Sequence, residues 1–430
     1  MRGQKLELVE RVDVAPVWSG CPVGFALLTS SNRQFLAYYS AERVMTLAQR
    51  ELNTKAWACV ELPSKLGWDS HNYVALAADE AGYLHVSGNM HCVPLVYFRS
   101  EKPLDIMAMR PVHRMTGERE KRVTYPRFMK GPDNALLFTY RDGNSGNGSQ
   151  ILDRYDAASQ TWSRLTDAPL FDGQGKMNAY PHGPVLGKDG FYHLCWVWRD
   201  TPACETCHDI SYMRSRDLKH WENAFGKPVE LPVQLGADVV VDPVPAKGGL
   251  INPCQAIGFD TQGRVIVTYT KYDTAGNLQL MNARREGAQW KRYQSTDWNY
   301  RWAFSGGGTI ISEVGVGPVE VQDGAAVQGC SHAKLGGGRW RLDEATLKPS
   351  GKMPNRIQWP KEVGRMEHKV AGMGLRQAAD AAADPESGVS ADGYVYRACW
   401  ESLPANRDRP QPGGVPEPSM LRVYKMAVRK

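Results

Sequence analysis

The sequence lacks the features that would place it in a membrane, nucleic-acid-binding or disulfide-rich class. Its 430 residues contain no apolar run that approaches the ~18 residues of a membrane span. The net charge is +6, yet no block rich in Lys and Arg is present, so we expect neither a membrane nor a nucleic-acid partner. The first residues, MRGQKLELVERVDV, carry no apolar signal core. A diffuse positive charge of this kind would suit an anionic substrate such as an acidic polysaccharide.

Nine cysteines are too few and too scattered for a disulfide scaffold. Most stand alone in apolar or strand-like surroundings. We predict that these are small core residues: Cys21, Cys59, Cys92, Cys254, Cys330 and Cys399.

Helical patterns are also scarce. Two short segments have helical patterns, SAERVMTLAQREL from Ser40 to Leu52 and RQAADAAAD from Arg376, and we expect short helices there. Elsewhere, aromatic and β-branched runs alternate with clusters of Gly, Asn, Asp and Pro, which is typical of antiparallel β-structure. Thirteen tryptophans and eighteen tyrosines supply bulky side chains for packing between sheets.

Strand-like runs recur along the whole chain. They are FLAYYS at Phe35, YLHVSGN at Tyr83, ALLFTYRD at Ala135, FYHLCWVWRD at Phe191, RVIVTYTKYD at Arg264, GTIISEVG at Gly308 and YVYRACWES at Tyr394. Seven units spaced by about 45 to 85 residues fit four-stranded blades with insertions. We therefore predict an all-β fold, a seven-bladed β-propeller that forms a single domain over residues 1–430. A pair of β-sandwiches is the alternative, which the repetition disfavours.

The last unit contains a Pro-rich loop, LPANRDRPQPGGVPEPSM, followed by the strand LRVYKMAV. We expect this final strand to pair with the first unit and so close the ring. The inner strands of a propeller line a central channel, and ligands bind at one of its mouths. Residues at the ends of inner strands in neighbouring units are therefore candidates for one shared site.

Two histidines flank a predicted hairpin in the second unit. His71 directly precedes the strand NYVALAAD, and His91 follows YLHVSGN after a Gly-Asn turn. A hairpin of this length returns both of its ends to the same edge. We expect His71 and His91 to be spatial neighbours, although two structural histidines are the alternative.

The third unit adds a tyrosine and an arginine. Tyr125 precedes Pro126, which predicts an extended backbone at Tyr125. Arg141 ends a hydrophobic strand beside a Gly/Asn-rich loop, where a guanidinium could bind an anion. A surface ion pair with Asp142 is the alternative role for Arg141. The fourth unit supplies further candidates: Tyr180, His182, Arg199 and His208.

Several strings resemble the BNR-repeat propeller family, which includes ulvan lyases and related enzymes acting on rhamnose–uronic acid glycans. They are DSHNYVALAADEAGYLHVSGNMHCVPLVYFRSEKPLD, VTYPRF…LLFTYRDGNSGNG, HDISYMRSRDLKHWENAFG and WESLPANRDRP…LRVYKMAV. The resemblance runs from about residue 20 to the C-terminus and implies a seven-bladed propeller. It further implies that the cleavage point is surrounded by His71, His91, Tyr125 and Arg141. Tyr180, Arg199 and Asn72 are then the predicted substrate-binding residues.

A lyase of this kind removes the C5 proton of a uronic acid and expels the 4-linked oxygen. Arg141 would neutralise the carboxylate, and Tyr125 would protonate the departing oxygen. His71 or His91 would be the base, and the other would position the carboxylate. The alternatives are an α-L-rhamnosidase or other glycoside hydrolase on the same glycans, and a non-catalytic carbohydrate-binding propeller. A sialidase is disfavoured, because only SRDLKHW approaches the Asp-box pattern.

The segment HLCWVWRDTPACETCHD is the exception among the cysteines. It contains Cys195, Cys204, Cys207 and His208, and its C-x-x-C-H spacing predicts a structural zinc ion. The resemblance supports this prediction, since ulvan lyases carry such an ion. Haem attachment is disfavoured in a strand-rich repeat, and a cysteine pair without metal is the alternative. His208 is also a candidate for the substrate side.

The expected partner is an anionic polysaccharide or oligosaccharide, bound by a monomer. The same resemblance implies a secreted or periplasmic protein, although no signal is visible in this chain.

Overall fold

Regular structure is almost entirely β-strand in the computed structural model, which describes residues 4–236, 238–368 and 370–429. Helices in these ranges are limited to three single turns, η1 (Ile106–Ala108), η2 (Pro132–Asn134) and η3 (Cys204–Thr206). None of the helices in the described ranges is long and apolar enough to cross a membrane. The all-β prediction is confirmed.

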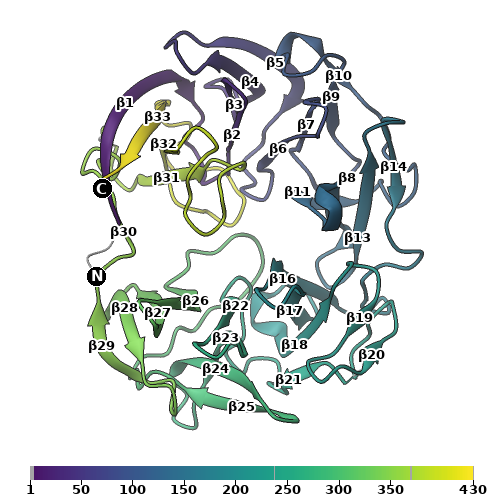
Figure 1. Ribbon diagram of the computed structural model, residues 1–430, viewed down its shortest axis with the longest axis vertical. Coiled ribbons are helices and arrows are strands. Elements are labelled where there is room, and N and C mark those ends of the chain that lie inside the picture. Colours follow the sequence, from purple (N-terminus) through teal and green to yellow (C-terminus); the bar gives the residue numbers. More distant parts are fainter. Residues whose placement is uncertain (1–3, 237, 369, 430) are drawn as a thin grey trace.

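The strands of the described residues form seven sheets, which follow one another along the chain and are arranged in a ring (Figure 1). The first sheet contains β2 (Ala26–Ser30), β3 (Arg33–Tyr39), β4 (Val44–Glu51) and β5 (Ala58–Lys65). The second contains β6 (Val74–Ala78), β7 (Leu84–Gly88), β9 (Tyr97–Ser100) and β10 (Met109–Pro111). The third contains β8 (His91–Val93), β11 (Val123–Lys130), β12 (Leu136–Asn144), β13 (Asn147–Asp156), β14 (Thr161–Arg164) and β15 (Phe171–Asp172).

The remaining sheets continue this pattern. The fourth contains β16 (Asn178–Leu186), β17 (Tyr192–Arg199), β18 (Cys207–Ser215), β19 (Trp221–Glu222), β20 (Pro228–Val229) and β21 (Val240–Asp242). The fifth contains β22 (Gln255–Phe259), β23 (Val265–Tyr272), β24 (Leu278–Glu286) and β25 (Gln289–Gln294). The sixth contains β26 (Val314–Gln322), β27 (Ala325–His332), β28 (Gly336–Leu342) and β29 (Pro349–Met353).

The seventh sheet joins the two ends of the chain. Its strand order is β30 (Ile357–Gln358), β1 (Gln4–Val17), β33 (Ser419–Val428), β32 (Tyr394–Ser402) and β31 (Gly374–Ala379). β1 and β33 are antiparallel, with Leu6 opposite Val428 and Val17 opposite Ser419. In Figure 1 the purple N-terminal strand runs beside the yellow C-terminal strand. The final strand was expected to pair with the first unit, but β33 pairs instead with the N-terminal strand β1, which belongs to the seventh sheet and not to the first.

The two predicted short helices are wrong, because the regular structure in both segments is β-strand. Residues 44–51 form β4, which is hydrogen-bonded to β3 on one side and β5 on the other. The segment from Arg376 begins in β31, which ends at Ala379 and pairs with β32, and it continues as an isolated bridge at Asp380 followed by a turn. Pairing within a sheet outweighs a local helical pattern, which is worth only a fraction of a kcal/mol per residue.

Large aromatic side chains fill the space within and between sheets. Trp18, Trp196 and Trp400 are almost completely buried. Phe25 stacks on Trp400 at 4.3 Å between ring centroids, which joins the start of the first sheet to the seventh. Such packing fixes neighbouring sheets relative to each other.

The prediction that the isolated cysteines are core residues holds for only half of them. All are free thiols, and Cys21, Cys254 and Cys399 are buried. Cys59 is exposed on β5, and Cys92 and Cys330 are half-buried. Cys59 and Cys92 lie on outer or connecting strands whose faces are open, which the strand-like pattern alone does not reveal.

Candidate active site

The two histidines lie at the ends of a hairpin, as predicted. β6 and β7 pair with Val74 opposite Gly88, so the residues before β6 and after β7 meet at one edge. The ring centroids of His71 and His91 are 4.4 Å apart. His91 begins β8, however, and β8 pairs with β11 of the third sheet rather than with the second. The histidine pair therefore bridges two neighbouring sheets.

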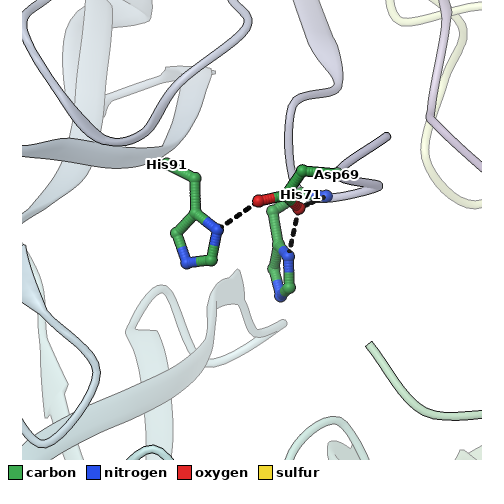
Figure 2. Close-up of side chains that lie close together, drawn as sticks. All are labelled: Asp69, His71 and His91. Carbon is green, nitrogen blue, oxygen red and sulfur yellow. Dashed lines mark hydrogen bonds and ion pairs between the residues drawn. The ribbon is translucent and has the colours of Figure 1, made fainter. Parts of the chain in front are cut away.

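The Asp69 carboxylate contacts the Nδ1 atom of both histidines. Its Oδ1 lies 2.6 Å from Nδ1 of His71, and its Oδ2 lies 2.5 Å from Nδ1 of His91. The backbone N–H of His71 donates to Oδ1 at 2.8 Å. Figure 2 shows each ring with one nitrogen toward the carboxylate and the other nitrogen pointing away. Both Nε2 atoms are thus free of Asp69 and available to a ligand.

Two distant loops complete the environment of His71. Oδ2 of Asp408 lies 3.4 Å from His71 Nδ1, and it accepts the backbone N–H of Thr309 at 2.9 Å. The Ser70 hydroxyl donates to the Thr309 hydroxyl at 2.8 Å. Asp408 belongs to the Pro-rich loop before β33, and Thr309 to the loop before β26. Segments from three sheets therefore meet at one histidine.

These carboxylates decide the charge on His71. Burial lowers the pKa of His71, but the hydrogen bonds with Asp408 and Asp69 outweigh this effect and raise the pKa to about 9. Burial alone would raise the pKa of Asp69, but the hydrogen bonds from His71 and His91 hold it well below its usual range. Near neutral pH, His71 is a cation beside an ionised Asp69.

Tyr125 faces the histidines from β11, in a backbone conformation that differs from the prediction. Its φ is +59°, in the left-handed region, whereas Pro126 predicted an extended residue. The β11–β12 register shifts between Thr124 and Arg127, so Tyr125 sits in an irregularity of the strand. For an aromatic residue this conformation is strained, and such strain is concentrated at functional sites.

The Tyr125 side chain stands between the charged and the aromatic parts of the site. Its ring centroid is 5.8 Å from that of His71 and 6.3 Å from that of Tyr180. Its hydroxyl makes no hydrogen bond to any residue that the structure describes. Burial and, next, the proximity of Tyr180 raise the pKa of Tyr125, while Arg141 and Arg199 oppose the rise. The phenol is therefore protonated near neutral pH and has an unused donor.

Arg141 lies behind the aromatic rings and is not a surface residue. It is 2% exposed, and its Cζ is 5.0 Å from the Tyr125 ring centroid. Nη1 donates to the Tyr180 hydroxyl at 3.3 Å, and Nη2 donates to Thr124 Oγ1 at 3.1 Å. The alternative of an ion pair with Asp142 is wrong, since that carboxylate approaches the guanidinium of Arg119 instead.

The predicted substrate-binding residues are divided between the cleft and its wall. Tyr180 lines the cleft, and its hydroxyl is 2.6 Å from that of Ser145. The Arg199 guanidinium is 5.3 Å from the Tyr180 ring, but it donates to the carbonyls of Thr201 and Pro202. The Oδ1 atom of Asn72 is buried without a hydrogen-bond partner in the described part of the chain.

The site opens into a cleft of about 500 Å³. Its walls come from the second, third, fourth and fifth sheets and the loop before β26, and they include His71, Tyr125, Tyr180 and Thr309. Sequence reasoning missed Asp69, Asp408 and Thr309. Asp69 had a local signal, as a carboxylate two residues before His71, whereas Asp408 and Thr309 are brought in only by the fold.

The four predicted zinc ligands do not form one cluster. Cys195 lies within β17 and is fully buried, Cys204 belongs to η3, and Cys207 and His208 begin β18. Both ring nitrogens of His208 already contact carboxylates, Asp209 at 2.8 Å and Asp200 at 2.9 Å. In the described residues, no three of these four bring their ligand atoms within 4.8 Å of one another. The set does not fit a tetrahedral zinc site, and zinc stays a prediction without geometric support.

One group of described residues does have the spacing of metal ligands, namely Asp69, His71 and His91. Their ligand atoms all lie within 4.8 Å of one another. The Nδ1–oxygen distances of 2.5 and 2.6 Å are those of hydrogen bonds between the ligands themselves. The three side chains are therefore already joined by hydrogen bonds to one another, an arrangement that holds protons between them.

A model of the BNR repeat-containing family matches residues 33–298, which is more than half of the chain. The chain belongs to this family. The matched region spans the hairpin of His71 and His91 as well as the strands of Tyr125, Arg141 and Tyr180.

Curated relatives of this BNR repeat protein are similar over a short segment. An ulvan lyase, long isoform, of Pseudoalteromonas sp. (strain PLSV) is 39% identical over 62 residues, which are 14% of this chain and 6% of the relative. The short isoform of Alteromonas sp. (strain LOR) is 38% identical over 61 residues, 14% of this chain and 12% of the relative. The chain matches only a small part of these relatives' length. The predicted resemblance to ulvan lyases is confirmed.

Solved structures share the fold over nearly the whole chain. Polysaccharide lyase Uly1 has a TM-score of 0.63 at 13% identity and covers 98% of this chain and 100% of its own. A PL25 ulvan lyase bound to -[GlcA(1-4)Rha3S]- has a TM-score of 0.61 at 12% identity, with 97% and 96% covered. At this identity the likeness establishes the fold of the BNR repeat protein.

Proposed function

We propose that this protein is a polysaccharide lyase that cleaves an ulvan-like rhamnose–uronic acid glycan by β-elimination. One observation carries the proposal: His71, held together with His91 by Asp69, lies beside an unbonded Tyr125 phenol in a single cleft. The ulvan lyases among the relatives and structural neighbours support the same substrate class. On this basis we also propose that the seven sheets are the blades of a propeller, with the cleft at one mouth of its channel.

Because His71 is positively charged near neutral pH, we assign it the role of binding the uronate carboxylate. The C5 proton is hard to remove while the carboxylate beside it is ionised, because the carbanion adds a second negative charge. A protonated His71, which lines the cleft and whose Nε2 points away from Asp69 (Figure 2), donates to the carboxylate and stabilises the enolate-like charge of the transition state. The sequence predicted Arg141 as the residue that neutralises this carboxylate. Arg141 lies instead behind the rings of Tyr125 and Tyr180, and its charge influences the site from there.

His91 and Tyr125 remain for the two proton transfers. With Nδ1 of His91 held by Asp69, its Nε2 is left to accept the C5 proton. Tyr125 has a protonated hydroxyl without a partner and donates its proton to the departing 4-linked oxygen. The carbon–oxygen bond breaks, the C4–C5 double bond forms, and a proton from solvent restores the phenol.

A glycoside hydrolase is the alternative function, and the site supports it less well. An ordinary glycoside hydrolase needs a carboxylic acid that remains protonated, with a raised pKa, to protonate the leaving group, and only a hydrolase that uses a histidine instead avoids this need. The two carboxylates beside His71, Asp69 and Asp408, both have pKa values lowered by their hydrogen bonds to that histidine, against the effect of burial. Neither is suited to be a general acid near neutral pH.

The decisive experiment is to incubate the protein with ulvan and follow the ultraviolet absorbance of the unsaturated uronate. We expect the absorbance to rise with time and to be lost in His71→Ala. Release of reducing ends or free rhamnose without that absorbance would contradict the lyase and favour the hydrolase. Binding without either product would leave only a carbohydrate-binding role. Because such polymers are extracellular, we further propose a secreted or periplasmic location.

A further inference from the structure

The cleft contains a second cation that the proposed mechanism does not use. Arg127 follows Tyr125 by two residues on β11, and both side chains line the same cleft. Nη2 of Arg127 donates to the carbonyl of Gly183 at 2.6 Å and approaches Met129 Sδ at 3.6 Å. A guanidinium has five N–H donors. Most donors of Arg127 are therefore open.

Arg127 has no counter-charge in the described part of the chain. No described Asp or Glu lines this cleft, and none forms an ion pair with Arg127. Part of the Arg127 side chain is exposed to solvent. The cleft walls around the guanidinium desolvate it and lower its pKa. A charge in a concave, partly desolvated wall attracts an oppositely charged ligand more strongly than one on a convex surface.

The other cations of the site are already satisfied. His71 is shared between Asp69 and Asp408, and Arg141 is buried against Thr124 and Tyr180. Arg127 differs from both because it combines solvent access with the absence of a carboxylate.

A second donor accompanies Arg127. His182 of β16 lines the same part of the cleft and has no hydrogen bond to the described residues. Burial and, next, the charge of Arg127 lower the pKa of His182, so its ring is neutral near neutral pH and offers one N–H. Both side chains line the cleft and are close enough for the Arg127 charge to act on the His182 ring, so the wall offers a planar fork and a further single donor.

We propose that Arg127 and His182 form a second anion-binding subsite, for an oxyanion substituent on the sugar beside the uronate that is cleaved. This inference rests on the proposed lyase function. Because His71 binds the carboxylate of the reacting uronate, the anionic group that Arg127 binds must belong to the next sugar. A guanidinium fork matches the paired oxygens of a tetrahedral ester or a carboxylate. The substituent is a sulfate ester or a second uronate carboxylate.

The test compares sulfated and chemically desulfated ulvan oligosaccharides of the same length. Wild type, Arg127→Gln, Arg127→Lys and Lys130→Gln are assayed on both, with the unsaturated uronate as readout. Lys130→Gln is the matched control, since Lys130 is an exposed cation on the same strand and outside the cleft. Circular dichroism and thermal unfolding establish that the variants are folded.

We expect Arg127→Gln to lower kcat/KM on the sulfated substrate by roughly tenfold to a hundredfold, mainly through KM, with partial rescue by Arg127→Lys. A loss confined to the sulfated substrate identifies the sulfate ester as the ligand. An equal loss on both substrates that disappears when the uronate carboxyls are reduced, measured by calorimetric binding, identifies a carboxylate.

Wild-type kinetics of Arg127→Gln on both substrates, in an otherwise active lyase, would overturn the subsite. So would an effect of Lys130→Gln as large as that of Arg127→Gln, because it would reveal a diffuse effect of net charge. If no variant makes unsaturated product, the proposed function has failed. Calorimetric binding of the sulfated oligosaccharide then tests the subsite by itself, and equal affinities of wild type and Arg127→Gln would contradict it.

Discussion

The histidine side and the aromatic side of the candidate site differ in how firmly their polar groups are held. On the histidine side every charged group is tied down: Asp69 contacts both histidines, and Asp408 contacts His71 and the backbone of Thr309. On the aromatic side Tyr125 carries a hydroxyl without a partner in the described residues, on a strained backbone. Fixed charges suit groups that stabilise a transition state, because they need no reorganisation. A loosely held phenol suits the group whose proton has to move.

Removing the free phenol is the strongest way to break this contrast. We expect Tyr125→Phe to lower kcat by roughly 10²- to 10⁴-fold, the usual contribution of general acid–base catalysis, with little change in KM. The assay is the rate of unsaturated uronate formation on ulvan. Tyr83→Phe is a matched control, because Tyr83 is half-buried and lies outside the cleft. A Tyr125→Phe rate near that of wild type would remove Tyr125 from the mechanism.

Neutralising the central carboxylate tests the histidine side. We expect Asp69→Asn to lower kcat/KM by roughly 10- to 100-fold, because both rings lose a charge-assisted hydrogen bond. The pH dependence gives the sharper readout. In wild type the cationic form of His71 persists below its pKa of about 9, so KM should rise as pH increases through about 9. In Asp69→Asn this rise should move to lower pH, toward the ordinary value of 6.5.

Asp408→Asn should shift the same KM profile less far, because its contact with His71 is longer, 3.4 Å against 2.6 Å. Superimposable KM profiles of wild type and Asp69→Asn would contradict the assignment of His71 as the carboxylate-binding cation.

The smallest expected effect lies at the edge of the aromatic side. Ser145→Ala removes the hydroxyl that lies 2.6 Å from the Tyr180 hydroxyl, but Arg141 still donates to that oxygen. One neutral hydrogen bond contributes about 0.5–1.5 kcal/mol, so we expect a loss of only a few-fold in kcat/KM. A loss as large as that of Tyr125→Phe would show that Tyr180, rather than Tyr125, is the proton donor.

Local patterns in the sequence predicted what depends on short-range geometry. The strand alternation predicted the β-fold, and the hairpin spacing placed His71 beside His91. They failed where the fold overrides local preference. Residues 44–51 have a helical pattern but are held between two strands. Pro126 predicted an extended Tyr125, and the irregular register of β11 imposes a positive φ instead.

Long-range convergence was invisible in the sequence. Asp408 and Thr309 reach His71 from loops more than 200 residues away. Thr309 lies in GTIISEVG, which was predicted as a strand, but β26 begins only at Val314 and Thr309 is in the loop before it. The cysteine spacing failed for the complementary reason. A C-x-x-C-H string predicts a shared ion only if the loop turns its side chains to one point, and here the segment passes from a single helical turn into β18.

Because β1 pairs with β33, the seventh sheet is completed only after the other six sheets have been synthesised. The seventh sheet needs residues from both ends, so it cannot form until the last strand has been synthesised. Asp408 is carried by the loop that leads directly into that strand. A ribosome-bound chain that stops before Ser419 leaves open strand edges and lacks a properly anchored partner for His71. Assembly of the charge that we propose binds the uronate carboxylate is thereby coupled to closure of the ring, and a truncated product should be both aggregation-prone and inactive.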